Sequence, residues 1–297
     1  MIEKRYWIHS VTPLHLGAGR GLGYIDLPVA REKVTNWPFI PGSSVKGVIA
    51  DHFGADDSSR KKDKTLKAAF GIAGDESSSS SSTAGSLVFT DAHLLLLPVR
   101  SFYGAFAWIT SPFALERFCR DMPDIKLTVA APEKDENVLL ATGSVLAEQN
   151  KIYLEDLDLS ASEDKAVTEL AEVIGKALFA QEPEWQKILK QRLAVVSDNI
   201  FTFLCESGTE VSPHIRIDDN TGVVAKGALW YEEALPVETV LTGKVWCDKV
   251  YKSSEEAAVE SSALFEKYCT AELSLQLGGK ASTGKGLVRC VFEPIGK

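Results

Sequence analysis

The segment Pro38-Phe-Ile-Pro-Gly-Ser-Ser-Val-Lys-Gly47 joins a short apolar run to the start of a helix. Serine is a favourable N-cap residue, so Ser43 or Ser44 is expected to cap a helix over residues 45–53. Lys46 lies in the first turns of that helix, where unpaired backbone N–H groups already favour an anion. Lys46 is therefore a candidate phosphate ligand, although a solvated charge on a helix surface is the commoner role for such a residue.

A glycine cluster lies upstream of this segment. Residues 5–16 are rich in aromatic and β-branched side chains, which predicts a strand that ends at Gly17, Gly19, Gly21 and Gly23. The cluster does not have the spacing of a dinucleotide-binding loop, because no glycine stands at the sixth position counted from Gly17 or from Gly19. So many glycines together indicate that the backbone closely approaches another chain, such as a ligand chain.

A second glycine-rich segment, Gly279-Lys-Ala-Ser-Thr-Gly-Lys285, contains most of a nucleotide phosphate loop. Gly286 stands where the loop needs a hydroxyl for magnesium, and the residues after it predict a strand, whereas a phosphate loop opens a helix. We therefore expect no nucleotide cofactor. The segment is either a basic loop whose N–H groups and lysines approach a phosphate backbone, or a flexible connection between two strands.

The remaining pattern mixes helices and strands without regular alternation, which favours the α+β class. Strands are predicted at 85–97, 237–247, 271–277 and 287–292, hairpins at 138–149 with 151–159 and at 210–217 with 223–231, and helices at 112–120, 165–179, 185–193, 199–205 and 255–269. The second hairpin surrounds Asp218-Asp-Asn-Thr-Gly222, a strong turn signal. Residues 56–64 are predicted as a charged loop, and the six serines of 77–82 as a low-complexity segment.

Composition is that of a globular protein, with 297 residues of which 45% are apolar and 25% charged. The net charge of -9 is concentrated in residues 155–172, which hold seven acids and one base. Acids are absent from residues 4–25 and 273–292, so basic surfaces can exist on this acidic chain. With no apolar run near 20 residues and charges already at Glu3, Lys4 and Arg5, we expect a cytoplasmic protein that does not bind membranes.

Four segments occur together: Thr12-Pro-Leu-His-Leu-Gly-Ala-Gly-Arg-Gly-Leu-Gly-Tyr-Ile-Asp-Leu-Pro28, the segment 38–47, Gly85-Ser-Leu-Val-Phe-Thr-Asp-Ala92, and the loop 277–286. In this combination the chain resembles the RAMP superfamily of CRISPR-associated RNA-binding proteins. More narrowly, the first segment and Gly227-Ala-Leu-Trp-Tyr-Glu-Glu-Ala-Leu-Pro236 resemble the repeating backbone subunit of the type III-B (Cmr) effector complex. The resemblance runs from residue 6 to about 292, with the serine run as a variable insertion.

The resemblance implies a ferredoxin-like (RRM-type) palm with an inserted β-hairpin thumb and helical additions. The chain would be one domain, 1–297, with a variable insertion at about 55–84 and the thumb at about 206–235, around Gly222. Copies of such a subunit stack head to tail along CRISPR RNA beside other Cmr subunits, and each thumb displaces one nucleotide from the guide–target duplex. The family cleaves the bound single-stranded target RNA at regular intervals with an aspartate at the position of Asp26.

Cleavage of a ribose phosphodiester by its 2′-hydroxyl needs a base, a cation or both. Asp26 is thus the candidate catalytic residue, as a base or as the ligand of a divalent cation such as Mg²⁺ or Mn²⁺, and Glu232 is a second candidate. The predicted RNA-binding residues are His15, Gly17, Arg20, Ser43, Lys46, Gly279, Lys280 and Lys285. The leading hypothesis is an RNA-guided endoribonuclease; the alternatives are a non-catalytic RNA-binding scaffold and, less favoured, a nucleotide-binding enzyme.

Overall fold

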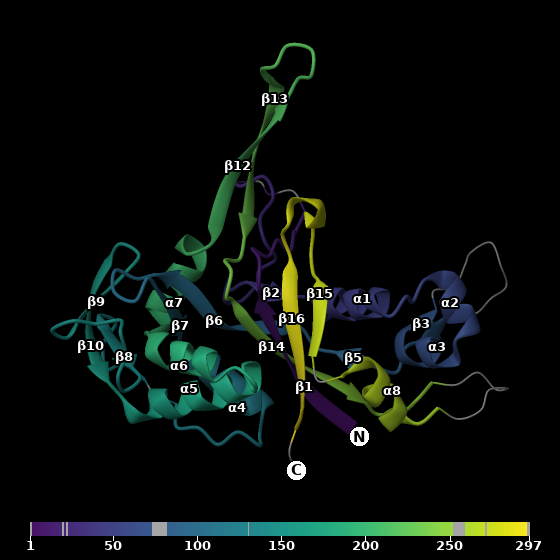
Figure 1. Ribbon diagram of the computed structural model, residues 1–297, viewed down its shortest axis with the longest axis horizontal. Coiled ribbons are helices and arrows are strands. Elements are labelled where there is room, and N and C mark those ends of the chain that lie inside the picture. The colour runs from purple at the N-terminus through teal and green to yellow at the C-terminus, as the bar shows by residue number, and fades with distance from the viewer. Residues whose placement is uncertain are drawn as a thin grey trace.

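The computed structural model describes residues 2–19, 21, 23–72, 82–129, 131–251, 259–270 and 272–295. Its main element is a mixed sheet of twelve strands (Figure 1). Ten strands follow one another in the order β15 (Glu272–Gln276), β16 (Leu287–Pro294), β1 (Ile2–Ser10), β14 (Val240–Cys247), β6 (Ala92–Arg100), β7 (Phe106–Thr110), β11 (Leu193–Val195), β8 (Asn137–Leu140), β10 (Leu157–Glu163) and β9 (Lys151–Leu154). Two short strands are added, β2 (Phe39–Ile40) on β6 and β5 (Val88–Phe89) on β14. The α+β prediction is confirmed.

Four strands, in the order β16-β1-β14-β6, form the centre of this sheet, and each neighbouring pair is antiparallel. β1 and β6 therefore run parallel, and the chain passes between them through α1 (Gly42–His52). β14 and β16 are also parallel to each other, with α8 (Ser261–Tyr268) between them in the sequence. The strand that begins the chain is thus central, and the loops that leave its end lie beside those that join the last strands.

Alternate residues of β1 belong to two cores, as expected for a strand covered on both faces. Tyr6 and Ile8 belong to the core that includes α1, α8 and α3 (Lys64–Phe70). Trp7 belongs to the other core, with α4 (Pro112–Asp121), α5 (Lys165–Leu178) and α6 (Pro183–Arg192). Figure 1 shows these two sets of helices on opposite sides of the central strands. The sheet between them is a rigid platform for the loops at its upper edge.

A long hairpin of β12 (Glu210–Ile217) and β13 (Val224–Ala234) projects from this platform as a separate two-stranded sheet (Figure 1). Its turn is closed by Asp218, whose carboxylate accepts hydrogen bonds from the backbone N–H groups of Asn220 and Thr221. Gly222 has a φ of 68°, a conformation that glycine adopts without strain. The hairpin predicted from the turn residues is confirmed. It follows α7 (Asp198–Ser207), close to the predicted helix 199–205.

The start of α1 differs from the prediction. The helix begins at Gly42, Pro41 stands at the N-cap position, and neither Ser43 nor Ser44 is the cap. The Gly42 N–H donates instead to the carboxylate of Asp91, 2.8 Å away, from the segment between β5 and β6. A contact between distant segments therefore replaces the local serine cap that the sequence predicts.

The prediction of a charged loop at 56–64 is wrong, because α2 (Asp57–Lys62) and α3 lie there. Asp56 and Asp63 are the N-caps of these two helices. Charged residues from which we predicted a loop therefore cap helices instead. The predicted hairpin of 138–149 with 151–159 is also wrong, since β8 pairs in parallel with β10 and the hairpin is β9 with β10.

Part of the predicted helix 255–269, with the serines at 77–81, lies outside the described residues, and α8 begins at Ser261. A small pair, β3 (Gly71–Ile72) with β4 (Thr83–Ala84), flanks that serine run. Among the helices of the described chain, none has both the length and the apolar character that a membrane crossing requires.

Candidate nucleic-acid interface

A groove of about 420 Å³ lies at the base of the hairpin. It brings together three segments that are far apart in the sequence: the loop after β1, the strand β13 and the loop between β15 and β16. Its lining residues are Gly21, Asp26, Leu27, Gly227, Leu229, Trp230 and Lys280. Two residues selected from the sequence, Asp26 and Lys280, thus share one groove.

Asp26 is held in this groove by the hairpin. Its Oδ2 accepts a hydrogen bond of 2.8 Å from the backbone N–H of Tyr231, and the N–H of Leu27 donates to the Tyr231 carbonyl at 3.1 Å. The side chain is exposed, and its second oxygen, Oδ1, has no hydrogen bond to the described residues. A carboxylate that is fixed through one oxygen and open at the other can accept a proton or bind a cation.

Glu232 is surrounded by cations and donors. It is 2% exposed, and its Oε1 accepts hydrogen bonds from Lys280 Nζ at 2.6 Å and from Trp230 Nε1 at 2.7 Å. Lys285 Nζ and His214 Nε2 lie 3.8 and 3.4 Å from its Oε2. Burial alone would raise the pKa of Glu232, but the hydrogen bonds from Lys280 and Trp230 outweigh burial and lower it. Glu232 is therefore ionised and binds the lysines of the glycine-rich loop to the hairpin.

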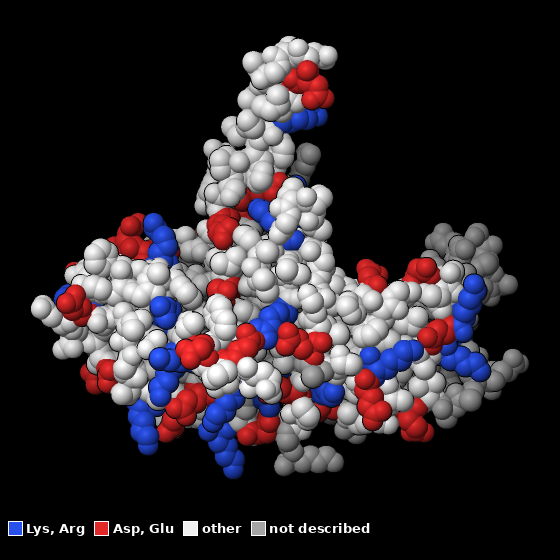
Figure 2. Space-filling model, viewed as in Figure 1, with Lys and Arg blue, Asp and Glu red and all other residues white. Residues whose placement is uncertain are grey.

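Figure 2 shows acidic and basic side chains gathered where the hairpin meets the body of the molecule. The sequence indicated Lys280 and Lys285 from the loop and Glu232 from the hairpin, but not His214 and Trp230. These two rings stack at 5.8 Å with an interplanar angle of 17°. His214 and Trp230 are opposite each other in the register of β12 and β13. Their contact could be predicted only with knowledge of that register.

A second, smaller groove of about 210 Å³ lies between the two glycine-rich loops and the start of α1. It is lined by Leu16, Gly17, Ala30, Pro41, Ser44, Gly278 and Gly279. At Gly278 the φ is 76°, and a Cβ there would lie 2.2 Å from the carbonyl oxygen of His15, so only glycine fits this close approach. The groove therefore presents backbone and small side chains to any bound chain.

His15 lies behind these glycines. It is 5% exposed, its Nδ1 lies 2.6 Å from the carbonyl oxygen of Glu233, and its own carbonyl accepts from Gly279 N–H. Since a carbonyl only accepts, the Nδ1 nitrogen carries a proton and donates it to Glu233. A Cβ at Gly17 would be 3.0 Å from Nε2. His15 thus joins the hairpin to both glycine loops.

The other predicted RNA-binding residues lie elsewhere. Ser43 is exposed in the first turn of α1, whereas Ser44 lines the smaller groove. The Nζ of Lys46 lies close to Gly85, 2.7 Å from where a Cβ would stand, and Lys46 lines neither groove. Arg20 lies outside the described residues.

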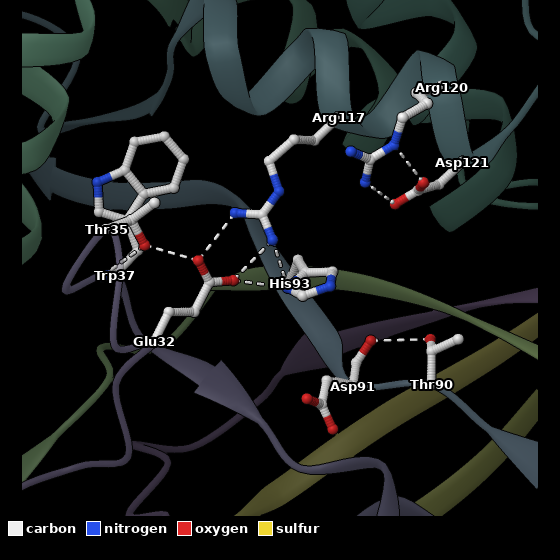
Figure 3. A network of polar contacts seen from close by, with 9 residues as sticks. All are labelled: Glu32, Thr35, Trp37, Thr90, Asp91, His93, Arg117, Arg120 and Asp121. Carbon is white, nitrogen blue, oxygen red and sulfur yellow. Dashed lines mark hydrogen bonds and ion pairs between the residues drawn. The ribbon is translucent and has the colours of Figure 1, made fainter.

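The segment that carries Asp26 is fastened on its C-terminal side by two carboxylates, the buried Glu233 and the half-buried Glu32. Glu233 accepts hydrogen bonds from Arg31 Nη2 at 2.5 Å and from the backbone N–H of Val29 at 2.9 Å. The Glu32 carboxylate accepts hydrogen bonds from both terminal nitrogens of Arg117, at 2.9 and 2.8 Å, and one of its oxygens lies 2.6 Å from His93 Nδ1 (Figure 3). These contacts connect the segment to β13, β6 and α4, so its position depends on the whole fold.

Glu32→Gln should reduce the free energy of unfolding by about 2 kcal/mol at pH 7, because hydrogen bonds to a charged group are lost. Burial would raise the pKa of Glu32, but the bonds from His93 and Arg117 hold it well below its ordinary value. The ionised form therefore stabilises the fold above about pH 4, the ordinary glutamate range, and this stabilisation is lost as the pH falls towards the folded-state pKa.

Chemical unfolding of wild type and Glu32→Gln between pH 3 and pH 7 measures this difference. The exposed Glu169, whose carboxylate is 3.5 Å from Lys165, provides the matched control Glu169→Gln, for which we expect little effect. A Glu32→Gln difference that stays constant down to pH 3 would show that the charge of Glu32 is not what matters.

A model of the RAMP superfamily matches residues 7–289. The chain belongs to the RAMP superfamily. A RAMP relative from Pyrococcus furiosus, the CRISPR system Cmr endoribonuclease Cmr4, is 31% identical over 97% of this chain and 95% of its own length. The resemblance seen in the four sequence segments is thereby confirmed.

Two solved structures show the same fold along nearly the whole chain. Oligomeric Cmr4 from Pyrococcus furiosus superimposes with a TM-score of 0.73 at 24% identity and covers 100% of both chains. A chain of the type III-B Cmr-beta complex bound to cognate target RNA gives a TM-score of 0.69 at 22% identity, over 98% of this chain and 97% of that one. At these identities the likeness establishes the fold, including the projecting hairpin.

Proposed function

We propose that this RAMP protein is the backbone subunit of a type III-B (Cmr) complex that binds CRISPR RNA and cleaves the paired target RNA at regular intervals. Its partners are the guide RNA, single-stranded target RNA, further copies of itself and other Cmr subunits. The full-length relative from Pyrococcus furiosus, named as an endoribonuclease, supports this activity. The observation that carries the proposal is the open oxygen of Asp26 in a groove that also holds Lys280.

The four central strands are the palm in this proposal. The order β16-β1-β14-β6, with α1 and α8 as the two connecting helices, is the arrangement of a ferredoxin-like fold. β12 and β13 are the thumb, which lies within the predicted range of about 206–235. The guide backbone lies along the smaller groove, where Gly17, Gly278 and Gly279 allow a bound chain to approach the protein backbone closely.

Cleavage proceeds by in-line attack of a target 2′-hydroxyl on the adjacent phosphorus. Asp26 accepts the hydroxyl proton through Oδ1, because Oδ2 is engaged by the Tyr231 N–H. The new O2′–P bond forms, the P–O5′ bond breaks, and O5′ takes a proton from water. The products are a 2′,3′-cyclic phosphate and a 5′-hydroxyl. The thumb places the target strand by displacing the nucleotide beside the groove.

A divalent cation, Mg²⁺ or Mn²⁺, belongs to the second form of the proposal, in which Oδ1 of Asp26 would hold the cation and water would take the hydroxyl proton. Mg²⁺ is often held by one or two carboxylates together with substrate phosphates, and the free oxygen of Asp26 fits that manner of binding. Among the described residues no group of three or more His, Cys, Asp or Glu side chains forms a site by itself. When bound, the cation would neutralise charge on the phosphate.

If Asp26 acts through a cation, chelation should abolish target cleavage and leave guide binding intact. We expect EDTA to stop cleavage by the assembled complex and Mg²⁺ or Mn²⁺ to restore it, while the guide RNA stays bound in a filter-binding assay. Full cleavage in EDTA would remove the cation from the proposal without affecting the role of Asp26.

The second candidate function is a scaffold that binds RNA without cleaving it. The two are separated by reconstituting the complex with guide RNA and adding end-labelled target. The endonuclease yields fragments at regular spacing from the paired target and leaves an unpaired RNA uncut. A complex that binds the paired target without cutting it would be the scaffold.

A further inference from the structure

The geometry points to Lys280 as a second catalytic residue, one that contacts the scissile phosphate of the target and stabilises the charge that develops during cleavage. This inference rests on the proposed function and assigns a role on the target strand to a lysine expected from the sequence to bind RNA. It is carried by the shared groove, in which the ammonium of Lys280 and the carboxylate of Asp26 are lining groups supplied by separate loops.

The backbone at Lys280 forms a tight turn that fixes the position of this residue. Its φ of 69° is in the left-handed region, which is uncommon for residues other than glycine and is concentrated at functional sites. The Lys280 carbonyl accepts hydrogen bonds from the Thr283 N–H at 3.0 Å and the Thr283 hydroxyl at 2.8 Å. A short 3-10 turn, η1 (Ala281–Thr283), follows directly. The loop is thus a closed, braced turn.

The side chain of Lys280 is also positioned before RNA binds. Its Nζ lies 2.6 Å from Glu232 Oε1 and 6.0 Å from the centre of the Trp230 ring, and the side chain remains 33% exposed. An ammonium has three donors, so after the bond to Glu232 it can still donate to a phosphate oxygen. Trp230 and Glu232 therefore orient the cation and leave part of it open to the groove.

Attack on a phosphodiester increases the negative charge on the non-bridging oxygens, and a preoriented cation in the same groove offsets that charge. Lys285 is less suited to this role, because its side chain is only 14% exposed and does not line this groove. Lys280 is accordingly the lysine that can reach the phosphate.

Single-turnover cleavage by guide-loaded complexes tests the assignment, with target affinity measured on a target that carries 2′-deoxy residues at the cut sites. Lys280→Gln should lower the rate at saturating complex by about a hundredfold, the usual effect of losing one preorganised donor, with the dissociation constant within about twofold. Lys151→Gln, which removes a lysine 3.0 Å from Asp158 at the far end of the sheet, is the matched control and should leave both unchanged.

Lys280→Gln also leaves Glu232 without its closest cation. A loss of rate caused by this structural change must therefore be separated from the loss of a phosphate contact. The double variant Lys280→Gln with Glu232→Gln removes both charges of this ion pair, so a loss of melting temperature caused by the unpaired carboxylate should be reversed. If Lys280 touches the phosphate, the double variant stays as slow as Lys280→Gln, whereas Glu232→Gln alone, which keeps Lys280, is slowed less. Recovery of the rate along with stability would overturn the assignment, as would a rate loss that merely follows weaker target binding.

The Asp26→Asn complex is measured in parallel. If Asp26→Asn is inactive while Lys280→Gln cleaves at the wild-type rate, this inference alone fails. If Asp26→Asn cleaves normally, the proposed active site fails and the inference falls with it.

Discussion

Replacing Asp26 with asparagine is expected to slow target cleavage by about a hundredfold or more while guide and target binding persist. Asparagine can still accept the hydrogen bond from the Tyr231 N–H through its amide oxygen, so the loop should keep its place. It lacks a negative charge and cannot accept the 2′-hydroxyl proton. Because Asp26 is exposed, we expect the free energy of unfolding to change by no more than about 0.5 kcal/mol.

The measurement is single-turnover cleavage of end-labelled target by the reconstituted complex, alongside thermal unfolding. Asp156→Asn provides the matched control, because Asp156 is an exposed aspartate in the turn between β9 and β10. Normal cleavage by an intact Asp26→Asn complex would transfer the chemistry to another residue, with Glu232 examined next.

Replacing Glu232 with alanine should have a broader effect, lowering stability, RNA binding and cleavage together. The change leaves Lys280, Lys285 and His214 near a cavity without their shared anion. Removing one member of a buried ion pair costs about 3 kcal/mol or more. The connection between the glycine-rich loop and the thumb would be lost, and the target strand would no longer be positioned over Asp26.

Thermal unfolding, guide affinity and cleavage rate measured on the same Glu232→Ala preparation test this expectation. Glu232→Gln retains an acceptor for Lys280 and Trp230 and should be affected less in all three. A different pattern, in which Glu232→Ala is as stable as wild type and binds RNA normally but does not cleave, would instead identify Glu232 as a second catalytic carboxylate.

The sequence predicted elements whose structure depends on residues close together in the chain, such as the hairpin turn. The turn residues at 218–222 placed the thumb hairpin, since Asp218 and Gly222 satisfy the turn by themselves. The strand predicted after Gly286 is confirmed, because β16 follows there. The resemblance to RAMP proteins, and not the periodicity, singled out Asp26 among ordinary turn residues.

Contacts between distant segments were not predictable in this way. The bond from Tyr231 N–H to Asp26 joins residues 205 positions apart, and the Asp91 carboxylate that replaces a serine cap on α1 is 49 residues away. The parallel pairing of β8 with β10 likewise depends on the sheet around it. For Lys46 the sequence correctly predicted a position in the first turns of α1, but not the direction of the side chain, whose Nζ lies close to Gly85.

Cleavage by complexes assembled from defined mixtures of wild-type and Asp26→Asn chains tests the central claim most directly. If each copy cuts the target with its own Asp26, every regularly spaced product should decrease in proportion to the fraction of Asp26→Asn chain, and the cut positions should not move. In complexes built wholly from Asp26→Asn chains the products should disappear while the target remains bound. The same set of fragments, at undiminished rates, from those complexes would contradict the account.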